Sequence, residues 1–434
     1  MSDTLHILVA DYVPIANKGE EAIVRGIEDM LSDGRPTALG IFGDVPNVVR
    51  KDNITIFPRT WLFRFEGDPT LSGGRRVFRQ IAIAAQLRLG SNGKLKNLTP
   101  EGNPRCRALQ AFFERADYVL VGHDGVFCVE SCGIIHLAKR YGKRVGILGA
   151  STGIGAGRWY KAGLYRKALD ASDFCVFRER FSCESIQQIA REPEKLILAP
   201  DPAFAMQPAQ AEEAIGLLEQ HERYRKAREA GRPVIAVTVL EKGRVYSGFR
   251  PDLQGQAKQQ AHARYVATVL DALIAQKNAF ILFLPHSVEE DASDITAARH
   301  VVEQMQAGPN DCMILEEDCT ARLLKGIIRE CDFVIGERTH SLIGSVSVAT
   351  PFVGLTNRRD MRTHGIIGEM CRCKHQIVDM DVNDEQAAAR RALESLESRA
   401  SIRKALEPVR RDLTNRLAEI SRLIKNSTTV HPNP

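Results

Sequence analysis

One stretch near the end of the chain, Cys331 to Leu355, constrains the fold more than any other. An apolar run, Phe333 to Ile335, leads into the polar turn Gly336 to His340. Small and apolar residues from Ser341 to Ala349 follow, and after Thr350-Pro351 a second apolar run completes the stretch. This order predicts a strand, a turn, a helix and a second strand, which together form a right-handed crossover in a parallel sheet.

The polar turn of this stretch carries three side chains suited to chemistry: Glu337, Arg338 and His340. In parallel sheets, ligands bind outside the carboxyl ends of the strands, which is where this turn is expected. The helix that follows offers free N–H groups and a partial positive charge at its N-terminus, and both favour an anion. An arginine and a histidine at the same place therefore predict an anion site with a proton-transfer group beside it.

Strand and helix patterns alternate through most of the chain. A polar, helical stretch, Gln207 to Gly231, interrupts the alternation, and Val234 to Leu240 restarts it. Because 434 residues are too many for one ordinary core, this interruption is the expected domain boundary. Before the boundary, the predicted strands include residues 6–10, 118–121, 145–148, 174–177 and 196–198.

The alternation predicts an α/β fold with two doubly wound, Rossmann-like domains that face each other across a cleft, the GT-B-like architecture of sugar-transfer enzymes. We expect an N-terminal domain over residues 1–208 and a C-terminal domain over residues 209–383, which carries the Arg338-Thr-His motif. Residues 384–434 should form C-terminal helices and a tail. Their Ala-, Arg-, Leu- and Glu-rich composition predicts two helices, with Pro408 as the break.

Composition indicates a soluble globular protein, with 44% apolar and 26% charged residues. The longest apolar runs are far shorter than a membrane span, and the N-terminus lacks the pattern of a signal peptide. Ten cysteines are scattered along the chain, and Cys371 and Cys373 have the wrong spacing for a zinc pair. We therefore expect free thiols, no metal site and a location in the reducing cytoplasm.

Charge is uneven in the segment from Arg59 to Lys96, which holds eight basic and two acidic residues. Large apolar residues such as Trp61, Phe63 and Phe78 are interleaved with the basic ones. This mixture predicts peripheral contact with the anionic inner face of a membrane, and the alternative is an ordinary solvated loop and helix. No nucleic-acid motif accompanies the charge, so no nucleic-acid partner is expected.

Six short segments form a pattern through their order and spacing. They are Asn17-Lys-Gly-Glu-Glu-Ala-Ile23, Gly122-His-Asp-Gly125, Val176-Phe-Arg-Glu-Arg-Phe-Ser182, Asp201-Pro-Ala-Phe204, Phe283-Leu-Pro-His286, and Gly336-Glu-Arg-Thr-His-Ser-Leu-Ile-Gly344 with Pro351 beyond it. Together they resemble the polysaccharide pyruvyl transferase family over roughly residues 5 to 380.

This resemblance implies a GT-B-like fold and the transfer of pyruvate from phosphoenolpyruvate. The acceptor would be a sugar or lipid-linked oligosaccharide in the synthesis of a cell-surface polysaccharide, and the product a cyclic pyruvyl ketal. Phosphoenolpyruvate is then a co-substrate, and no other cofactor is expected. The N-terminal domain would be the acceptor side and the C-terminal domain the donor side.

The resemblance also implies roles for individual residues. His340 suits acid–base work near neutral pH, and Arg338 can bind a carboxylate or phosphate through two parallel N–H bonds; these two are the predicted catalytic residues. Arg178 matches an arginine that the family carries ahead of a serine, and Arg362 a basic residue after the second strand. Gly19 is expected where the backbone approaches a neighbour closely or takes a positive φ. The predicted substrate-binding residues are Arg178, Arg362, Asn17, Gly19, Asp124, His286 and Thr339.

The chain departs from the family pattern in the loop Gly122-His-Asp-Gly125, where the family often has three glycines. Asp124 or Glu130 could supply the carboxylate that the family carries a few residues later. Glu20 stands where an aspartate usually follows the Asn17-x-Gly pattern, and it keeps the charge.

Structural interpretations of the same residues remain open. Arg338 and His340 could satisfy backbone carbonyls, Arg178 could pair with Glu179 or Glu184, and His286 could be a turn residue. A nucleotide-sugar glycosyltransferase with the same architecture is the alternative enzyme, with Glu316, Glu317 or Glu337 as its ribose-binding acid. A catalytically inactive carbohydrate-binding relative is the alternative that is not an enzyme.

Overall fold

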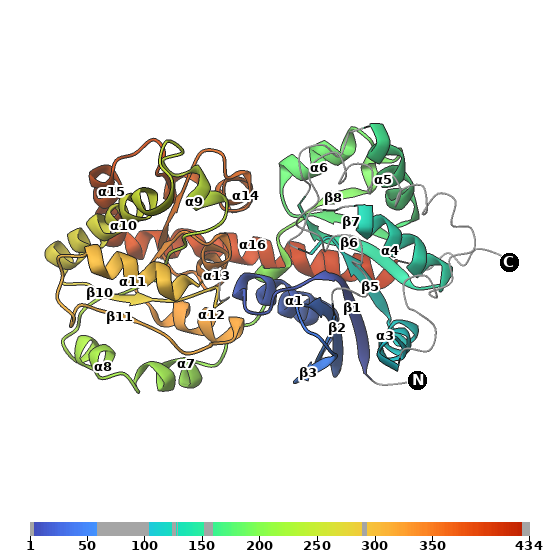
Figure 1. The fold of residues 1–434 in the computed structure, drawn as a ribbon, viewed down its shortest axis with the longest axis horizontal. Coiled ribbons are helices and arrows are strands. Elements are labelled where there is room, and N and C mark those ends of the chain that lie inside the picture. The colour runs from blue at the N-terminus through green and yellow to red at the C-terminus, as the bar shows by residue number, and fades with distance from the viewer. Residues whose placement is uncertain are drawn as a thin grey trace. The chain divides into compact units, whose positions relative to one another are not determined.

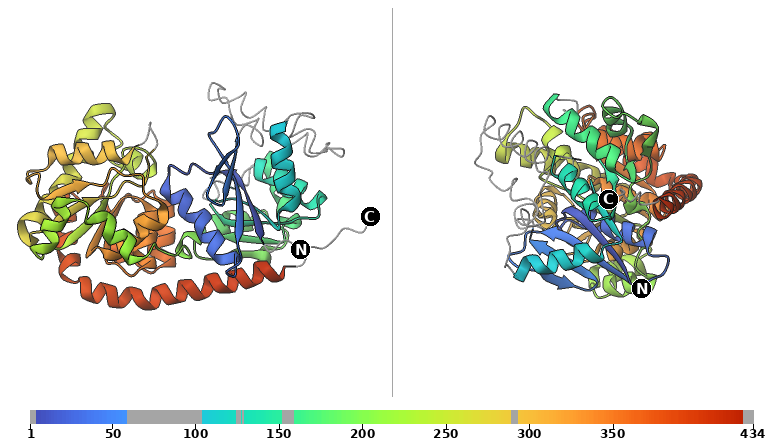
Figure 2. Two further views of the ribbon diagram at one scale, coloured as in Figure 1. Left: turned by 90° about the horizontal axis from the view of Figure 1, so that it is seen from below. Right: turned by 90° about the vertical axis from the view of Figure 1, so that its right-hand side faces the viewer.

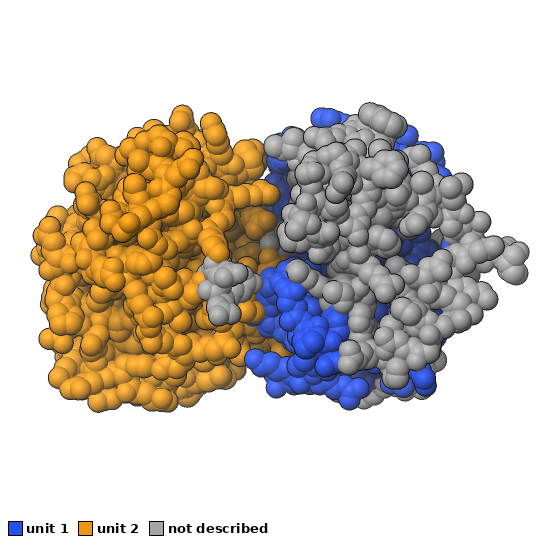
Figure 3. Space-filling model, viewed as in Figure 1, with its two compact units in different colours: residues 1–15, 27–202, 417–434 blue, residues 16–26, 203–416 orange. Residues whose placement is uncertain are grey.

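The computed structural model describes residues 4–58, 104–123, 127, 129–151, 159–288 and 293–427. The basic segment 59–96 and the predicted ligand Asp124 lie outside the described residues. The chain forms two compact units (Figure 3). Unit 1 comprises residues 1–15, 27–202 and 417–434, and unit 2 comprises residues 16–26 and 203–416.

The described part of unit 1 is built on an eight-stranded sheet with the order β3-β4-β2-β1-β5-β6-β7-β8 (Figure 1). Neighbouring strands are parallel, except that β3 is antiparallel to β4. The strands are β1 (Leu5–Tyr12), β2 (Thr37–Gly43), β3 (Val49–Lys51), β4 (Ile54–Pro58), β5 (Tyr118–Val121), β6 (Arg144–Ala150), β7 (Phe174–Phe177) and β8 (Leu196–Leu198). The helices between them are α1 (Lys18–Leu31), α3 (Pro104–Arg115), α4 (Val129–Arg140), α5 (Trp159–Ala171), α6 (Arg180–Gln187), and the 3₁₀ turns η3 (Pro193–Lys195) and η4 (Pro202–Phe204).

The described part of unit 2 contains a six-stranded, fully parallel sheet with the order β11-β10-β9-β12-β13-β14. The strands are β9 (Val234–Thr238), β10 (Phe280–Phe283), β11 (Cys312–Ile314), β12 (Phe333–Gly336), β13 (Phe352–Thr356) and β14 (Ile377–Asp379). The helices are α7 (Ala211–Leu218), α8 (Glu222–Glu229), α9 (Arg244–Gly248), α10 (Gly255–Lys277), α11 (Asp294–Gln304), α12 (Ala321–Glu330), α13 (Thr339–Ser347), α14 (Met361–Thr363), the π-helix η6 (His364–Met370), the 3₁₀ turn η7 (Lys374–Gln376), α15 (Glu385–Glu397) and α16 (Arg399–Asn426).

The central strands of both sheets are apolar and completely buried. Every residue of β5 and β7 in unit 1, and of β9, β10, β12 and β13 in unit 2, is buried. A parallel sheet is covered by helices on both faces, so its strands are near-continuous apolar runs rather than alternating patterns. The α/β class with two doubly wound parallel sheets, predicted from these runs, is confirmed.

The stretch from 331 to 355 forms the predicted crossover. The strand β12, the helix α13 and the strand β13 follow one another, and β12 pairs with β13 in parallel, with Val334 opposite Phe352. The order of the strands changes direction between the neighbours β9 and β12. From β9 the chain continues to β10 and β11 on one side, and from β12 it continues to β13 and β14 on the other side. Ligands of such sheets bind at this switch point, outside the carboxyl ends of the strands.

The compact units divide the chain differently from the predicted domains at residues 16–26, at residues 203–208 and at the C-terminal helices. Lys18 N donates to His286 O at 2.7 Å and Val288 N donates to Ala16 O at 3.1 Å, so the start of α1 pairs with the loop after β10. In unit 1, the hydroxyl of Ser421 bonds Met30 O, which attaches the last turns of α16 to that unit. Contacts between residues far apart in sequence thus produce this division.

Two C-terminal helices are present, but the predicted break at Pro408 is wrong. The chain leaves the helical conformation at Ser398, and α16 continues through Pro408 (Figure 2). A proline removes one backbone hydrogen bond. Tertiary contacts of α16, such as Arg416 Nη1 to Met370 S at 3.0 Å, support the helix on the far side of that position.

Two further properties concern the described residues only. The eight cysteines whose side chains the structure describes, Cys132, Cys175, Cys183, Cys312, Cys319, Cys331, Cys371 and Cys373, are unbonded and buried. None of their helices is long and apolar enough to span a bilayer.

Candidate active site

Arg338 occupies the N-cap position of α13, directly after β12. Its Nε donates to Asp294 Oδ2 at 3.1 Å, and its Nη2 donates to Asp294 Oδ1. The Arg338 side chain is nevertheless 20% exposed, whereas that of Asp294 is 2% exposed. Among the described residues, none accepts a hydrogen bond from Nη1 of Arg338. One edge of the guanidinium is thus held by Asp294, and the other edge is open to an anion.

Asp294 anchors this arrangement at the first residue of α11. Its Oδ2 also accepts hydrogen bonds from the backbone N–H groups of His286 and Ser287, each at 2.9 Å. Burial raises the pKa of the Asp294 carboxyl, and Arg338 and the two N–H groups act in the opposite direction. Asp294 therefore connects the loop after β10 to the arginine after β12.

Glu337 points away from the open edge of Arg338 and into the protein. Its Oε1 lies 2.7 Å from His262 Nε2, with both side chains at most 1% exposed, and its Oε2 accepts from Leu240 N at 2.9 Å. The backbone N of Glu337 donates to Thr238 O at 2.9 Å. Glu337 thus ties the loop after β9 and the helix α10 to the turn that carries Arg338.

His340 lies in the first turn of α13 and is half-buried. Gly19, in the first turn of α1, approaches it closely: a Cβ at Gly19 would lie 2.8 Å from His340 Cγ. Real Cβ atoms essentially never come so near, so a glycine is required beside this imidazole. Close approach, rather than a positive φ, is the reason for the glycine.

Asn17 precedes α1 and supports the same approach. Its Oδ1 accepts from Gly19 N at 3.1 Å, and its backbone O accepts from the N–H groups of Glu20 and Glu21 at 3.1 Å. The side chain therefore caps the helix at the turn where Gly19 meets His340. A contact between Asn17 and substrate stays a prediction.

Lys18 lies beside the loop after β10. The residue is 5% exposed, and its Nζ lies 2.5 Å from Asp318 Oδ1 and 3.8 Å from Glu21 Oε2. Its backbone N–H bonds His286 O at 2.7 Å, and the neighbouring Asn17 forms an antiparallel bridge with Ser287. These backbone contacts hold a buried ammonium group next to His286.

His286 is 5% exposed, and its Nδ1 lies 3.1 Å from Leu284 O. Because a carbonyl oxygen only accepts, this contact places the ring hydrogen on Nδ1. Burial lowers the pKa of His286 to about 4, and the positive charges of Arg338 and Lys18 act in the same direction. The imidazole is therefore neutral near pH 7, with a lone pair on Nε2.

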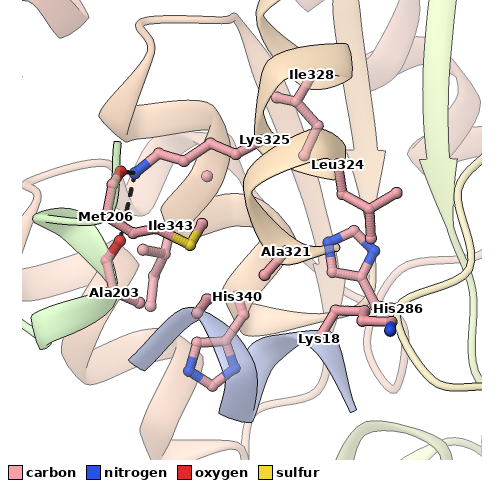
Figure 4. A pocket seen from close by; sticks show the side chains of 12 residues that line it. Lys18, Ala203, Met206, His286, Ala321, Leu324, Lys325, Ile328, His340 and Ile343 are labelled. Carbon is pink, nitrogen blue, oxygen red and sulfur yellow. Dashed lines mark hydrogen bonds between the residues drawn. The ribbon is translucent and has the colours of Figure 1, made fainter. Parts of the chain in front are cut away.

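Lys18, His286 and His340 line one small cavity of unit 2 (Figure 4). Its wall also includes Lys325 of α12, whose ammonium donates to the backbone oxygens of Ala203 and Met206. The cavity volume is about 20 Å³, which accommodates one water-sized group and no complete substrate. Apart from these four residues, the lining is apolar or glycine: Ala22, Ala203, Met206, Ala321, Leu324, Ile328, Ile343 and Gly344.

Two further predicted ligands lie next to the start of α13. Thr339, its first residue, has its Oγ1 2.7 Å from Thr363 Oγ1. Thr363 ends the short helix α14, which contains the half-buried Arg362. The structure therefore brings Thr339, and with it Thr363, the residue after Arg362 in the sequence, to the helix terminus that carries Arg338 and His340.

Arg178, by contrast, lies in unit 1 and is fully buried. Its Nε donates to Ser151 Oγ at 2.9 Å, and its Nη1 donates to Asp201 Oδ2 at 2.7 Å, with both side chains of the ion pair 0% exposed. Its partner is Asp201 rather than Glu179 or Glu184. This burial favours a structural role, and donor binding by Arg178 stays a prediction.

Sequence reasoning did not single out Lys18, Asp294 or His262. Lys18 stands inside the segment Asn17-Lys-Gly19, so its position next to two motif residues was a usable signal. Asp294 follows Ser293 at a helix start, where acidic residues are common, but nothing local relates it to Arg338. His262 lies within a long helix, and only the tertiary structure places it against Glu337.

Solved structures share this fold at low sequence identity. The UDP-GlcNAc 2-epimerase from Neisseria meningitidis, bound to UDP-GlcNAc, is 11% identical with a TM-score of 0.51, over 97% of this chain and 99% of that one. An alpha,alpha-trehalose-phosphate synthase (UDP-forming) from Burkholderia vietnamiensis is 12% identical with a TM-score of 0.53, over 98% of each chain. These structures support the GT-B fold class and nothing finer.

At the level of sequence, no curated protein matches the chain. The family model described as polysaccharide pyruvyl transferase, however, matches residues 17–359, which is most of the chain. The matched range includes the turn around Asn17, the buried Arg178 and the Arg338-Thr-His motif. The chain therefore belongs to the polysaccharide pyruvyl transferase family, a family of transferase enzymes.

Proposed function

We propose that this protein transfers pyruvate from phosphoenolpyruvate to two hydroxyl groups of a sugar in a cell-surface polysaccharide precursor, forming a cyclic pyruvyl ketal. The observation that carries the proposal is the open edge of Arg338 beside His340 at the N-terminus of α13. A planar guanidinium suits the carboxylate or phosphate of the donor, and the free N–H groups of the helix terminus favour its negative charge. Thr339 at the same terminus, and Arg362 directly before its partner Thr363 in the sequence, support a donor site there.

The chemistry of the proposed reaction needs proton transfer at two places. Two sugar hydroxyls each form a bond to C2 of the donor, and the bond from C2 to the phosphate oxygen breaks. One hydroxyl proton ends on the former methylene carbon, which becomes a methyl group, and the other ends on the released phosphate. His340 is the residue that we assign to protonation of the methylene carbon, because histidine exchanges protons near neutral pH.

A nucleotide-sugar glycosyltransferase is the second candidate, because the names of both structural neighbours contain UDP. Such an enzyme needs an acidic residue for the ribose. Of the three acids considered for this role, Glu316 pairs with Arg299 and Glu337 with His262, and Oε1 of Glu317 lies 3.2 Å from Nε2 of His221. Glu337 is completely buried against His262, so it is not accessible to a ribose, whereas Glu316 and Glu317 are about half exposed. The burial of Glu337 therefore counts against this candidate.

The test is incubation of the purified protein with phosphoenolpyruvate and a panel of sugar acceptors. Phosphate release is followed with time, and NMR detects the new methyl group of the ketal. We expect phosphate and ketal in equal amounts with at least one acceptor. Consumption of a UDP-sugar without phosphate release from phosphoenolpyruvate would support the second candidate. Sugar binding without turnover of either donor would indicate an inactive carbohydrate-binding protein.

A further inference from the structure

In the cavity lined by Lys18, His286 and His340, one ring nitrogen of His286 has no hydrogen-bond partner among the described residues. Nδ1 of His286 is occupied by Leu284 O, and among the described residues no group bonds Nε2. The residue is 5% exposed, and Nε2 is not among the described side-chain atoms that are both completely buried and without a partner. This nitrogen can therefore accept a hydrogen bond from a group that enters the cavity.

Lys18 lines the same cavity and supplies a hydrogen-bond donor, whereas Nε2 of His286 is an acceptor. An ammonium group has three donors and no acceptor, and among the described residues Nζ of Lys18 lies 2.5 Å from Asp318 and 3.8 Å from Glu21. The bond from Lys18 N to His286 O fixes the two residues side by side, and Figure 4 shows both side chains at the same end of the cavity. A ligand here would thus meet a donor and an acceptor together.

The pair selects one chemical class of ligand. A hydroxyl group can donate to Nε2 of His286 and accept from the Lys18 ammonium at the same time. An ionised phosphate or carboxylate oxygen only accepts, so it would face the lone pair of Nε2 without a bond. The volume of about 20 Å³ also admits one oxygen-sized group, and the remaining lining is largely apolar.

We propose that this cavity receives one hydroxyl group of the sugar acceptor, with His286 as its hydrogen-bond acceptor and Lys18 as its donor. The proposal rests on the proposed function, because it names the substrate group that enters this part of the site. His286 binds and orients the hydroxyl and does not remove its proton, since a pKa of about 4 makes it a weak base near pH 7. Lys18 favours the oxygen as negative charge develops on it.

Two substitutions of His286 distinguish the roles of its two ring nitrogens, Nδ1 and Nε2. His286→Asn keeps an amide N–H near the Nδ1 position for Leu284 O and loses the acceptor at Nε2, whereas His286→Gln places an amide oxygen near Nε2. We expect His286→Asn to raise the acceptor KM about tenfold, and His286→Gln to restore most of it, as for loss and rescue of one hydrogen bond. The KM for phosphoenolpyruvate should stay unchanged in both variants. An acceptor KM in His286→Asn equal to the wild-type value overturns the proposal.

Lys18→Met should raise the acceptor KM by a similar factor, with Asp318→Asn as the matched control that breaks the same ion pair but keeps the ammonium. Circular dichroism of each variant checks its fold. If Asp318→Asn raises the KM as much as Lys18→Met, the ion pair is structural and Lys18 is not a ligand of the hydroxyl.

Calorimetry with methyl glycosides of glucose, galactose and mannose, and with their monodeoxy analogues, identifies the bound hydroxyl without turnover. We expect the loss of one hydroxyl to weaken binding to the wild-type protein about tenfold and to leave binding to His286→Asn unchanged. Equal losses in both proteins overturn the proposal. A crystal structure with bound glycoside separates the two sources of a hydroxyl: a sugar oxygen in the cavity supports the proposal, and a water that stays there overturns it.

The outcomes also separate this inference from the proposed function. Binding that depends on His286, without phosphate release from phosphoenolpyruvate, would retain the hydroxyl site and reject pyruvyl transfer. Phosphate release with an unchanged acceptor KM in His286→Asn would retain pyruvyl transfer and reject the hydroxyl site.

Discussion

Two arginines of this protein follow a buried strand and precede a helix, and they differ in what surrounds them. Arg178 of unit 1 is enclosed by Asp201 and Ser151, with the ion pair fully buried. Arg338 of unit 2 uses one edge for Asp294 and is 20% exposed. Asp201 follows β8, the strand next to β7, whereas Asp294 follows β10, which is separated from β12 by β9. The same local pattern therefore forms a fully buried ion pair in unit 1 and a partly exposed guanidinium in unit 2.

The comparison predicts that the closed pair governs stability. Arg178→Met leaves the Asp201 carboxylate buried without its cation, so we expect a loss of about 3 to 5 kcal/mol in the free energy of unfolding. Arg338→Met should cost roughly 1 kcal/mol, because Asp294 keeps its two backbone N–H bonds. Urea unfolding followed by circular dichroism measures both. A stable Arg178→Met variant that no longer binds phosphoenolpyruvate would break the comparison and make Arg178 a donor ligand.

The open site should govern turnover. We expect His340→Gln to lower kcat about a hundredfold or more, while phosphoenolpyruvate affinity stays near that of the wild type, as for loss of an acid–base group. His375→Gln, at an exposed histidine of the same unit, is the control and should be neutral. Near-normal turnover of His340→Gln would remove this histidine from the mechanism.

His286 makes the open site sensitive to acid. Its pKa is about 4 in the folded protein and 6.5 in the unfolded chain, because burial and the charges of Arg338, His340 and Lys18 oppose protonation. A histidine with a lowered pKa contributes its full stability above pH 6.5 and loses it as the pH falls toward 4. Between pH 7.5 and pH 5, the wild type should therefore lose about 2 kcal/mol more unfolding free energy than His286→Asn. Parallel losses in the two proteins would show that His286 titrates normally.

The smallest expected effect concerns the planar shape of the Arg338 guanidinium. Arg338→Lys keeps the charge but cannot contact Asp294 and a donor anion at once through a planar fork, so we expect kcat/KM for phosphoenolpyruvate to fall about tenfold. Arg359→Lys, at an exposed arginine, provides the control. Full activity of Arg338→Lys would mean that charge alone is sufficient at this position.

Much of the fold could be predicted because it depends on local patterns. The buried strands are continuous apolar runs, and the turn from Gly336 to His340 separates strand from helix where polar residues interrupt such a run. Gly19 could be recognised as a position that needs glycine, although its neighbour His340 is more than three hundred residues away in sequence. The helix break predicted at Pro408 was wrong, because α16 continues through this residue despite the tendency of proline to end a helix.

The sequence by itself determined the α/β class, the crossover from 331 to 355 and the place of Arg338 and His340 at a strand end, because these follow from hydrophobic periodicity and turn chemistry. Only the tertiary structure decided which arginine is enclosed and which is open. It also brought Lys18 beside His286, through backbone hydrogen bonds between the turn before α1 and the loop after β10. The physical reason is that an ion pair or a cavity depends on which strand ends lie next to one another, and strand order is a property of the folded sheet rather than of any local segment.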